Sequence, residues 1–476
     1  MKSMPKVPDA YYQFVMDYAP YVYVVPSSGP DVEWGRAAFA AAFAIDFLFE
    51  AYFDPQFDDR SAEIEAKIVE LADWILTQQC TDSQKQAYGG FKSTENSNMF
   101  YSVDACRTVP ALLKAYELTT NAAYLSAAKL AAATFLYNMQ HKPSQISLHD
   151  RYYGGFAKAV TLADAWLPQM DVECLYGLAA LKMLCESDPA NRDTYESMML
   201  DAAAFYRPGL EGLYLYYDPP PAGDGRWHRT SLDDSLITDD SLAYALLGLY
   251  AIEGWSDTVR NAYAFVNAIS ASPLYAAYNP AICWAGYIDV VGRAPACDYY
   301  DNVTAGILAQ IRRDHDKSAY EFSVKIISKN AEKFMFWGCK HADYSFVENK
   351  QAMVTVCWLA QLLLGYEPPT TRFTQILRSK GESITLYPLK SAGERPAYGA
   401  GTDVKAIILP TKAEALLLEP GYVADDYLLL HVFAPVRRRD KIRRNGEDYE
   451  ILSVQDFTFK GEVALRKVLC RRIIGQ

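Results

Sequence analysis

Five acidic residues stand at positions from which their carboxyl groups could face one another. Hydrolysis of a glycosidic bond uses one carboxyl group that donates a proton and a second that attacks the sugar or activates water. The candidate catalytic residues are Asp171, Glu173 and Asp240 and, in second place, Asp104 and Asp301. Each stands near the start of an expected helix, where a single carboxylate is more typical of a helix cap. Burial decides which carboxyl is the acid and which the base, so the sequence leaves that open.

Aromatic residues beside glycine recur along the chain, and sugars stack on aromatic rings. The chain is rich in such rings, with 35 Tyr, 21 Phe and 8 Trp. If the glycine-aromatic loops cover the starts of the acidic helices, the rings would surround the carboxyl groups. The candidate substrate-binding residues in these loops are Tyr88, Phe91, Tyr153, Phe156, Tyr214, Trp284, Tyr287 and Trp337.

One further segment, 223–229, follows the three prolines 219–221 and has a basic and aromatic tip. This composition predicts either a lid that recognises an acidic ligand or a solvated surface loop. Trp227 and His228 from this segment complete the candidate substrate-binding set.

Metal, nucleotide and terpenoid chemistry have weaker support. Cys297, Cys339 and His341 could approach one another, but their spacing matches no zinc motif, so we expect no metal site and no cofactor. No phosphate-binding glycine motif is present. The string 238–243 is similar to the acidic motif of class II terpene cyclases, but the other motifs of that family are not evident.

Helical periodicity extends from residue 33 to about residue 365. It predicts eleven helices, and 9–18 adds a twelfth, so six pairs are available. Glycines at 90, 155, 212, 286 and 338 mark a repeating unit of about 50–75 residues, which is typical of repeat architectures. The predicted helices are 36–53, 64–76, 105–118, 122–139, 172–185, 195–206, 242–252, 259–269, 304–311, 320–334 and 353–364.

Alternate helices differ in polarity, which predicts two concentric rings. Every second predicted helix has acidic residues near its start. These helices are apolar on nearly all faces and must be buried, whereas helices such as 63–77 and 317–333 have a charged face. With its Gly-Gly-Phe turns, the region 8–365 resembles the (α/α)6 six-hairpin toroids of glycosidases, polysaccharide lyases and sugar epimerases. The resemblance implies a toroid domain over 1–367 that binds a polysaccharide or oligosaccharide, as a hydrolase or a lyase. Fold alone does not give function.

A second domain begins after the double proline at 368–369, where the helical period stops. We expect a small β-barrel or sandwich over 372–476. These residues carry 18 Lys and Arg against 13 Asp and Glu, a net +5, which leaves −17 for the remainder. The predicted strands are 383–387, 404–409, 413–418, 427–432, 449–454 and 462–469.

This second domain has a basic run, 437–444, before an Asn-Gly turn. The strings Asp440-Lys441-Ile442 and Tyr449-Glu450-Ile451 around that turn resemble the β-barrel of tailed-virus head-closure and head–tail adaptor proteins. The resemblance implies a virion or prophage component whose barrel docks to a protein assembly. The alternative to an enzyme is therefore a structural or adaptor protein of such a particle. No sequence-specific nucleic-acid binding is expected.

Composition agrees with a globular protein of 476 residues and net charge −12. We expect no membrane span, because the apolar runs are shorter than about 18 residues. No signal peptide is evident at the start, which predicts a protein that is cytoplasmic or assembled into a virus-like particle. Nine cysteines without a paired motif are expected to be buried thiols.

Overall fold

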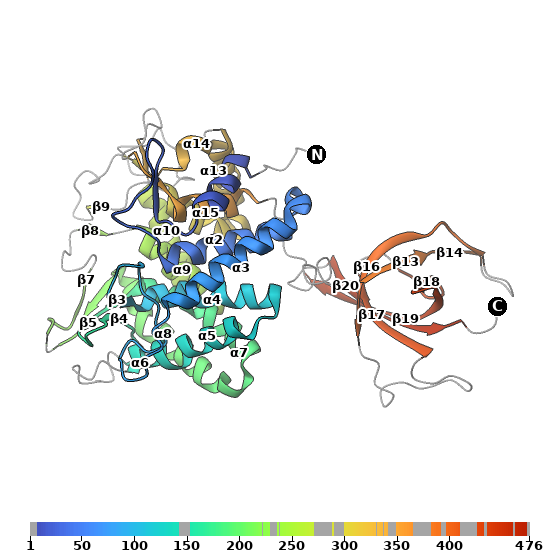
Figure 1. Cartoon of the computed structure of the whole chain (residues 1–476), viewed down its shortest axis with the longest axis horizontal. Helices are drawn as coiled ribbons and strands as arrows, with labels where there is room; N and C mark the ends of the chain where they lie inside the picture. Colours follow the sequence, from blue (N-terminus) through green and yellow to red (C-terminus); the bar gives the residue numbers. More distant parts are fainter. Residues whose placement is uncertain are drawn as a thin grey trace. The chain divides into compact units, whose positions relative to one another are not determined.

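The computed structural model divides into two compact units, Met1–Gly365 and Tyr366–Gln476 (Figure 1). Within the described ranges, no helix has both the length and the apolar character needed to cross a membrane. The described residues are 7–141, 153–220, 222–228, 236–237, 239–270, 288–289, 299–329, 331–336, 338–340, 349–364, 382–391, 397–409, 426–432, 436–459 and 462–473.

The inner helices of the first unit form a closed ring. Each one packs on the next, and the last packs back on the first. This closure, seen within the described residues, confirms the expected ring. In chain order the inner segments are α2 (Ala38–Tyr52), α4 (Ser102–Thr119), η4 with α7 (Val172–Tyr176 and Gly177–Ser187), α9 (Asp239–Glu253), α11 with α12 (Asn302–Ile307 and Ala309–His315) and α15 (Met353–Leu363).

An outer helical layer surrounds this ring, with one outer segment packed on each inner one. The first helix of the chain, α1 (Asp9–Tyr18), packs on α15, the last, and so completes the outer layer as expected. The hydroxyl of Tyr11 donates to the carbonyl of Ala331 at 2.8 Å across this junction. The other outer segments are α3 (Ser61–Gln78), α5 with η2 and α6 (Ala122–Leu130, Ala131–Leu136 and Tyr137–His141), α8 (Arg192–Gly212), α10 (Asp257–Ser270) and α13 with α14 (Lys317–Lys329 and Ala331–Phe334).

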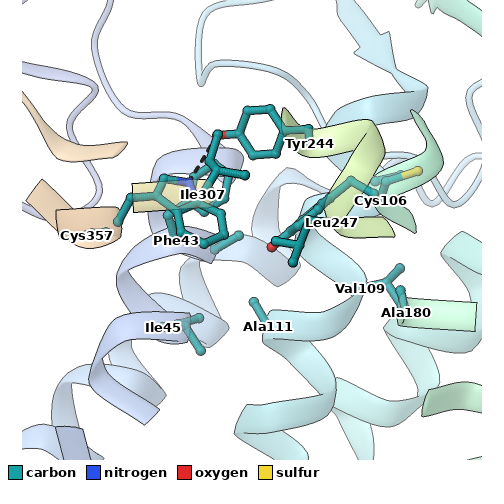
Figure 2. Close-up of a cluster of buried hydrophobic side chains, with 14 of the residues drawn as sticks. Phe43, Ile45, Cys106, Val109, Ala111, Ala180, Tyr244, Leu247, Ile307 and Cys357 are labelled. Carbon is teal, nitrogen blue, oxygen red and sulfur yellow. Dashed lines mark hydrogen bonds between the residues drawn. The ribbon is translucent and has the colours of Figure 1, made fainter. Parts of the chain in front are cut away.

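The two layers follow from the polarity of their helices. Almost every residue of α2 is buried, whereas α3 buries mainly a stripe that includes Ile64, Ile68, Leu71 and Ile75. Side chains of the inner helices fill the centre of the ring (Figure 2).

Aromatic residues from three inner helices meet in this core. The ring centroids of Phe43 and Trp358 are 5.6 Å apart, and those of Tyr244 and Trp358 are 6.0 Å apart. The indole Nε1 of Trp358 donates to the hydroxyl of Tyr244 at 3.1 Å, so both polar groups are satisfied inside the core.

A five-stranded antiparallel sheet lies where α4 and η4 begin. Its strand order is β3-β4-β5-β6-β7. β3 runs directly into α4 and β5 directly into η4, so the sheet holds the N-terminal ends of both inner segments. The strands are β3 (Met99–Tyr101), β4 (Ala157–Thr161), β5 (Trp166–Asp171), β6 (Tyr216–Asp218) and β7 (Arg226–His228).

The periodicity did not predict this sheet, because strands of three to six residues are too short to show a period. The expected loop at 223–229 was therefore wrong in part, since it contains β7.

The second Gly-Gly-Phe turn joins two consecutive outer helices. The amide Nε2 of Gln140, in α6, donates to the carbonyl of Gly154 at 2.9 Å and to that of Met198, in α8, at 3.0 Å. Gly154 has a φ of +99°, and a Cβ there would lie 2.2 Å from the carbonyl oxygen of Asp201. Only glycine fits, so packing between outer helices accounts for this part of the motif.

The first Gly-Gly-Phe turn has the same construction. Gln79, directly after α3, donates through Nε2 to the carbonyl of Gly89 at 2.9 Å and to that of Ala127, in α5, at 3.0 Å. Gly89 again has a positive φ, +87°. The repeat seen in the sequence is thus a repeated glutamine-glycine link between neighbouring outer helices.

The second unit contains a closed six-stranded barrel, which confirms the expected all-β domain. Five predicted strands overlap observed ones, while the sixth, 413–418, lies outside the described residues. The sixth observed strand of the barrel, β18, was not predicted and comes from the basic run 437–444. In barrel order the strands are β13 (Glu382–Tyr387), β16 (Thr402–Leu409), β17 (Tyr427–Val432), β20 (Glu462–Arg472), β19 (Glu447–Phe459) and β18 (Lys441–Arg444).

The β18–β19 hairpin turns at Asn445 and Gly446, whose φ values are +51° and +84°. Positive φ at both positions is the geometry that an Asn-Gly hairpin turn requires. Asp440, which is buried, anchors the hairpin: its carboxylate accepts the backbone N–H groups of Leu389 at 2.9 Å and Arg437 at 2.8 Å.

Candidate functional site

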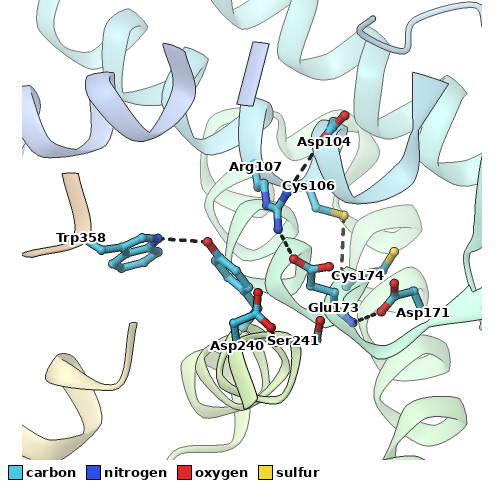
Figure 3. A network of polar contacts seen from close by, with 10 residues as sticks. Asp104, Cys106, Arg107, Asp171, Glu173, Cys174, Asp240, Ser241 and Trp358 are labelled. Atoms are coloured by element: carbon cyan, nitrogen blue, oxygen red, sulfur yellow. Dashed lines mark hydrogen bonds and ion pairs between the residues drawn. The ribbon is translucent and has the colours of Figure 1, made fainter. Parts of the chain in front are cut away.

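Carboxyl groups from two neighbouring inner segments share one arginine. Asp104 lies in the first turn of α4, and Glu173 lies in the first turn of η4. The Arg107 guanidinium forms an ion pair with Glu173 through Nη2, and its Nη1 lies 3.6 Å from Oδ1 of Asp104 (Figure 3). The structure thus brings Asp104 and Glu173 together, although 69 positions separate them in the sequence.

Arg107 is held between these carboxylates and aromatic rings. Its guanidinium carbon lies 4.7 Å from the ring centroid of Tyr244 and 5.5 Å from that of Phe43. Cation–π contacts of this kind strengthen when they are shielded from water. The surrounding carboxylates outweigh the burial of Arg107 and raise its pKa further above the usual range.

Asp171 caps η4 and lies beside Glu173. We call Asp104, Asp171 and Glu173 the carboxyl cluster. Its Oδ1 accepts the backbone N–H of Glu173 at 2.9 Å, so it is also the helix cap that its position predicted. Burial, reinforced by the charge of Glu173, raises the pKa of Asp171 to about 7. A hydrogen bond from Tyr216 and the charge of Lys158 oppose this rise only in part.

Asp104 is likewise almost fully buried. Burial raises its pKa to about 6, with a small further contribution from Glu173, while Arg107 and Ser93 oppose the rise. Two carboxyl groups of one cluster therefore hold protons up to pH values at which an ordinary aspartate is ionised.

Asp240 begins the next inner helix, α9, and is partly exposed. Its Oδ1 accepts the backbone N–H of Ser241 at 2.8 Å. Its charge contributes to raising the pKa of Tyr216 and of Tyr244, so it belongs to the same electrostatic neighbourhood. Asp301 ends β10 (Tyr299–Asp301), directly before α11, and its side chain lies outside the described residues.

The candidate aromatic residues are placed less uniformly than the sequence suggested. Phe91 and Phe156 are fully buried, so neither ring has a face open to a ligand; the expectation that they line an open site is wrong for these two. Tyr88 and Tyr214 are half-buried, and Tyr153 is exposed.

Tyr153 lies close to Asp201 of the outer helix α8. Three further candidates, Trp284, Tyr287 and Trp337, lie outside the described residues.

Trp227 and His228 both lie on β7, with their side chains on opposite faces of the strand. Trp227 packs against Phe205 of α8 and Tyr217 of β6, with ring centroids 5.4 Å away in both cases. His228 lies 3.0 Å through Nε2 from Oδ1 of Asp224. Trp227 is thus a packing residue of the hairpin, and His228 belongs to a polar cluster on its other face.

That cluster is the one group of metal-ligating side chains found among the described residues: Asp218, Asp224 and His228. Of the cysteines considered for zinc, Cys297 and the side chain of Cys339 lie outside the described part, as does His341. The described free cysteines, Cys80, Cys106, Cys174, Cys185, Cys357 and Cys470, are all buried, as expected.

Sequence reasoning missed three residues that surround the carboxyl cluster. Arg107 could have been found, because a charged residue on a helix that is otherwise nearly apolar needs a buried partner. Tyr216 and Lys158 carry no such signal, since they reach the cluster from the short strands β6 and β4.

No protein-family model and no curated protein sequence matches this chain. Solved structures match its fold at low identity. Cellobiose 2-epimerase from Spirochaeta thermophila DSM 6192 is 12% identical with a TM-score of 0.53, over 75% of this chain and 94% of that one. A sugar epimerase from a ruminal bacterium is 11% identical with a TM-score of 0.52, over 76% and 97%.

A family 76 glycoside hydrolase from a bovine Bacteroides thetaiotaomicron strain is 13% identical with a TM-score of 0.52, over 75% of this chain and 76% of that one. These likenesses agree with the closed double ring described above. The first unit has the fold of the (α/α)6 toroids.

Proposed function

We propose that the toroid is a carbohydrate-active unit that hydrolyses glycosidic bonds in an oligosaccharide or polysaccharide. The observation that supports this most is Asp171, a carboxyl group whose pKa burial raises to about 7 and which, like the partly exposed Asp240, acts electrostatically on Tyr216. A protonated acid and an ionised carboxylate in one site are what glycoside hydrolysis requires. The structural neighbours named above act on sugars by their titles, which agrees with a saccharide substrate.

The burial of each carboxyl suggests its role. Asp171 is the proton donor to the leaving oxygen, because it retains its proton near neutral pH. Asp240, which is partly exposed at the start of α9, is the second carboxylate, acting as nucleophile or as base for water. Glu173 and Asp104 act through Arg107 as positioning residues.

The test is release of reducing sugar from a panel of oligosaccharides and polysaccharides by the full chain. Asp171→Asn keeps the size of the side chain and removes its proton, so activity should fall by about 100-fold to 10,000-fold. Asp240→Asn should cause a loss of similar size. Asp193→Asn, the same change on the exposed face of α8, should leave activity unchanged.

Other results would redirect the proposal. An unsaturated, ultraviolet-absorbing product would indicate a lyase, and an isomerised sugar would indicate an epimerase. Binding of a glycan without any product would favour the alternative of a non-catalytic binding or adaptor protein. If Asp171→Asn and Asp193→Asn are equally active, the assignment of the acid is wrong.

We also propose that the barrel attaches this protein to a protein assembly, such as a virus-like particle. The supporting observation is the strand–turn–strand over 440–451, in which buried Asp440 anchors the chain before β18 and an Asn-Gly turn leads to Tyr449-Glu450-Ile451. The barrel also has a hydrophobic core of its own. Co-purification of particle proteins with the barrel, and not with the toroid alone, tests this role.

A further inference from the structure

Three metal-ligating side chains meet on the β6–β7 hairpin. Asp218 ends β6, Asp224 lies in the turn and His228 ends β7. One ligand atom from each lies within 4.8 Å of the other two. Two carboxylates and one imidazole form a donor set that suits divalent ions of the first transition row. We propose that Asp218, Asp224 and His228 bind one Zn²⁺ or Mn²⁺ ion.

Asp218 is the residue that points most clearly to a cation. Its side chain is only 8% exposed, and in the described part of the chain its carboxyl group takes part in no hydrogen bond or ion pair. Asp224, a second carboxylate, is its neighbour in the cluster. A buried carboxylate beside another one is costly unless a positive charge compensates for it. A divalent cation would neutralise both carboxylates at once.

The turn is built closely around the Asp218 carboxyl group. A Cβ at Gly223 would lie 2.2 Å from Cγ of Asp218, so any other residue at this position would push the carboxyl group aside. The N–H of Gly225, which has a φ of +72°, donates to the Asp218 carbonyl at 2.7 Å. The N–H of Arg226 donates to Oδ1 of Asp224 at 3.0 Å, which fixes the second carboxylate. The backbone therefore fixes the turn and the carboxylate of Asp224.

The site faces away from the hydrophobic side of the hairpin. Tyr216 pairs with His228 in the strand register, so Tyr216, Asp218 and His228 lie on one face. Tyr217 and Trp227 occupy the other face and pack on Phe205 of α8. A bound ion would link the ends of β6 and β7, and β6 is the strand from which Tyr216 hydrogen-bonds to Asp171. The ion would thus stabilise the strand that carries Tyr216, the hydrogen-bond partner of Asp171, without contacting the carboxyl cluster itself.

The experiment uses the full chain, stripped with a chelator and desalted, and titrated with MnCl₂, ZnCl₂ or MgCl₂ by calorimetry. We expect one Mn²⁺ or Zn²⁺ per chain, bound at least tenfold more tightly than Mg²⁺. Mn²⁺ is the decisive probe, because it has little preference for the cysteine thiols elsewhere in the chain. Asp218→Asn should weaken Mn²⁺ binding at least tenfold. Asp314→Asn, beside His315 on α12, is the matched control and should change nothing.

Thermal unfolding provides a second measurement and a check on folding. A ligand that binds only the folded state raises the unfolding midpoint. Mn²⁺ should therefore raise the midpoint of the wild type and of Asp314→Asn, but not that of Asp218→Asn. The metal-free Asp218→Asn protein should be at least as stable as the metal-free wild type, because it lacks a buried charge. Absence of Mn²⁺ and Zn²⁺ binding, or binding that Asp218→Asn leaves unchanged, would overturn the proposal.

Discussion

Two arginines, Arg444 in the barrel and Arg107 in the toroid, serve carboxylates in different ways. In the barrel, Arg444 forms two hydrogen bonds with Glu382, at 2.8 Å and 2.9 Å, and this contact lowers the pKa of Glu382. In the toroid, Arg107 serves both Asp104 and Glu173, while burial raises the pKa of Asp104 and of nearby Asp171. The partly exposed Glu382, with a cation of its own, stays ionised, whereas the buried Asp104, which shares its cation with Glu173, retains its proton to a higher pH.

The basic run of the barrel illustrates the first case. Lys441 and Arg443 both pair with Asp448, at 2.9 Å and 2.7 Å, and so are occupied within the barrel. The net charge of the basic run therefore overstates the positive charge that it offers to a partner.

The largest effect should come from removing the shared arginine. Arg107→Met leaves the buried Asp104 and the half-buried Glu173 without their cation, which should cost about 3–5 kcal/mol of unfolding free energy at neutral pH. Urea denaturation of the full chain measures it. Arg207→Met, which breaks a more exposed pair with Glu253 in the same unit, should cost only about 0–1 kcal/mol. Equal losses in the two variants would show that an arginine shared by two carboxylates contributes no more stability than an arginine paired with one.

Opposite responses to pH should separate the two units next. Asp171 and Asp104 have raised pKa values, so these two groups bind more protons in the folded toroid than in the unfolded chain between about pH 4 and pH 7, while the lowered pKa values of Asp31, Glu95 and Asp188 act only at the acidic end of this window. Its stability should therefore fall as pH rises through this window, by about 1.4 kcal/mol per unit of pKa shift at most. Glu382 and Asp448 have lowered pKa values, so the barrel should instead lose stability as pH falls below about 4.

Thermal unfolding at a series of pH values checks this prediction. Asp171→Asn is the control, since it should flatten the slope of the toroid between pH 5 and pH 7 and leave that of the barrel unchanged. A toroid whose stability rises steadily from pH 4 to pH 8 would show that Asp171 and Asp104 are ionised throughout.

A smaller loss of unfolding free energy is expected when the ion pair between Arg444 and Glu382 in the barrel is broken. Arg444→Met removes a partly exposed ion pair and should cost about 0.2–1 kcal/mol, a loss that salt reduces further. Denaturation of the barrel in low and in high salt measures both quantities. A loss above 2 kcal/mol would mean that this pair behaves like the buried cluster.

The smallest effect concerns the toroid after removal of the barrel. Each unit has its own hydrophobic core, so a chain truncated after Gly365 should keep the unfolding midpoint and any glycan activity of the toroid. Circular dichroism and the glycan panel measure these. An unfolded or inactive truncated chain with an intact full-length parent would show that the two units depend on each other.

Helix positions were accessible from the sequence, because burial imposes a period on long helices. The expected helix 9–18 and the expected strand 427–432 match the observed elements to the residue. The proximity of Asp104 and Glu173 was also expected, since both begin neighbouring inner segments. Arg107 could have been noticed as a charged residue on a mostly apolar helix, but its partner Glu173 is distant in sequence, so no local pattern identifies the pair.

Two aromatic candidates, Phe91 and Phe156, are buried for a packing reason that the sequence did not reveal. The Gly-Gly-Phe motif is shaped by the link between outer helices, in which Gly154 abuts the backbone of α8. Phe156 is buried as part of the same packing, with Tyr206 donating from its hydroxyl to the Phe156 carbonyl. A motif that repeats along a chain can therefore mark the links between repeats as well as the residues that contact a ligand.

The closure of the ring by α1 and α15 has a consequence for how the chain is made. Tyr11 donates to Ala331, and Tyr23 pairs with Ala352, so the first helix finds its partners more than 300 residues later. At synthesis rates of about 5–20 residues per second, Tyr11 is added to the chain roughly 16–64 s before Ala331. During that time the face of α1 that packs on α15 has no native partner, although Tyr12 can already stack on Phe57. We expect the nascent chain to bind chaperones until its last inner helix has been translated.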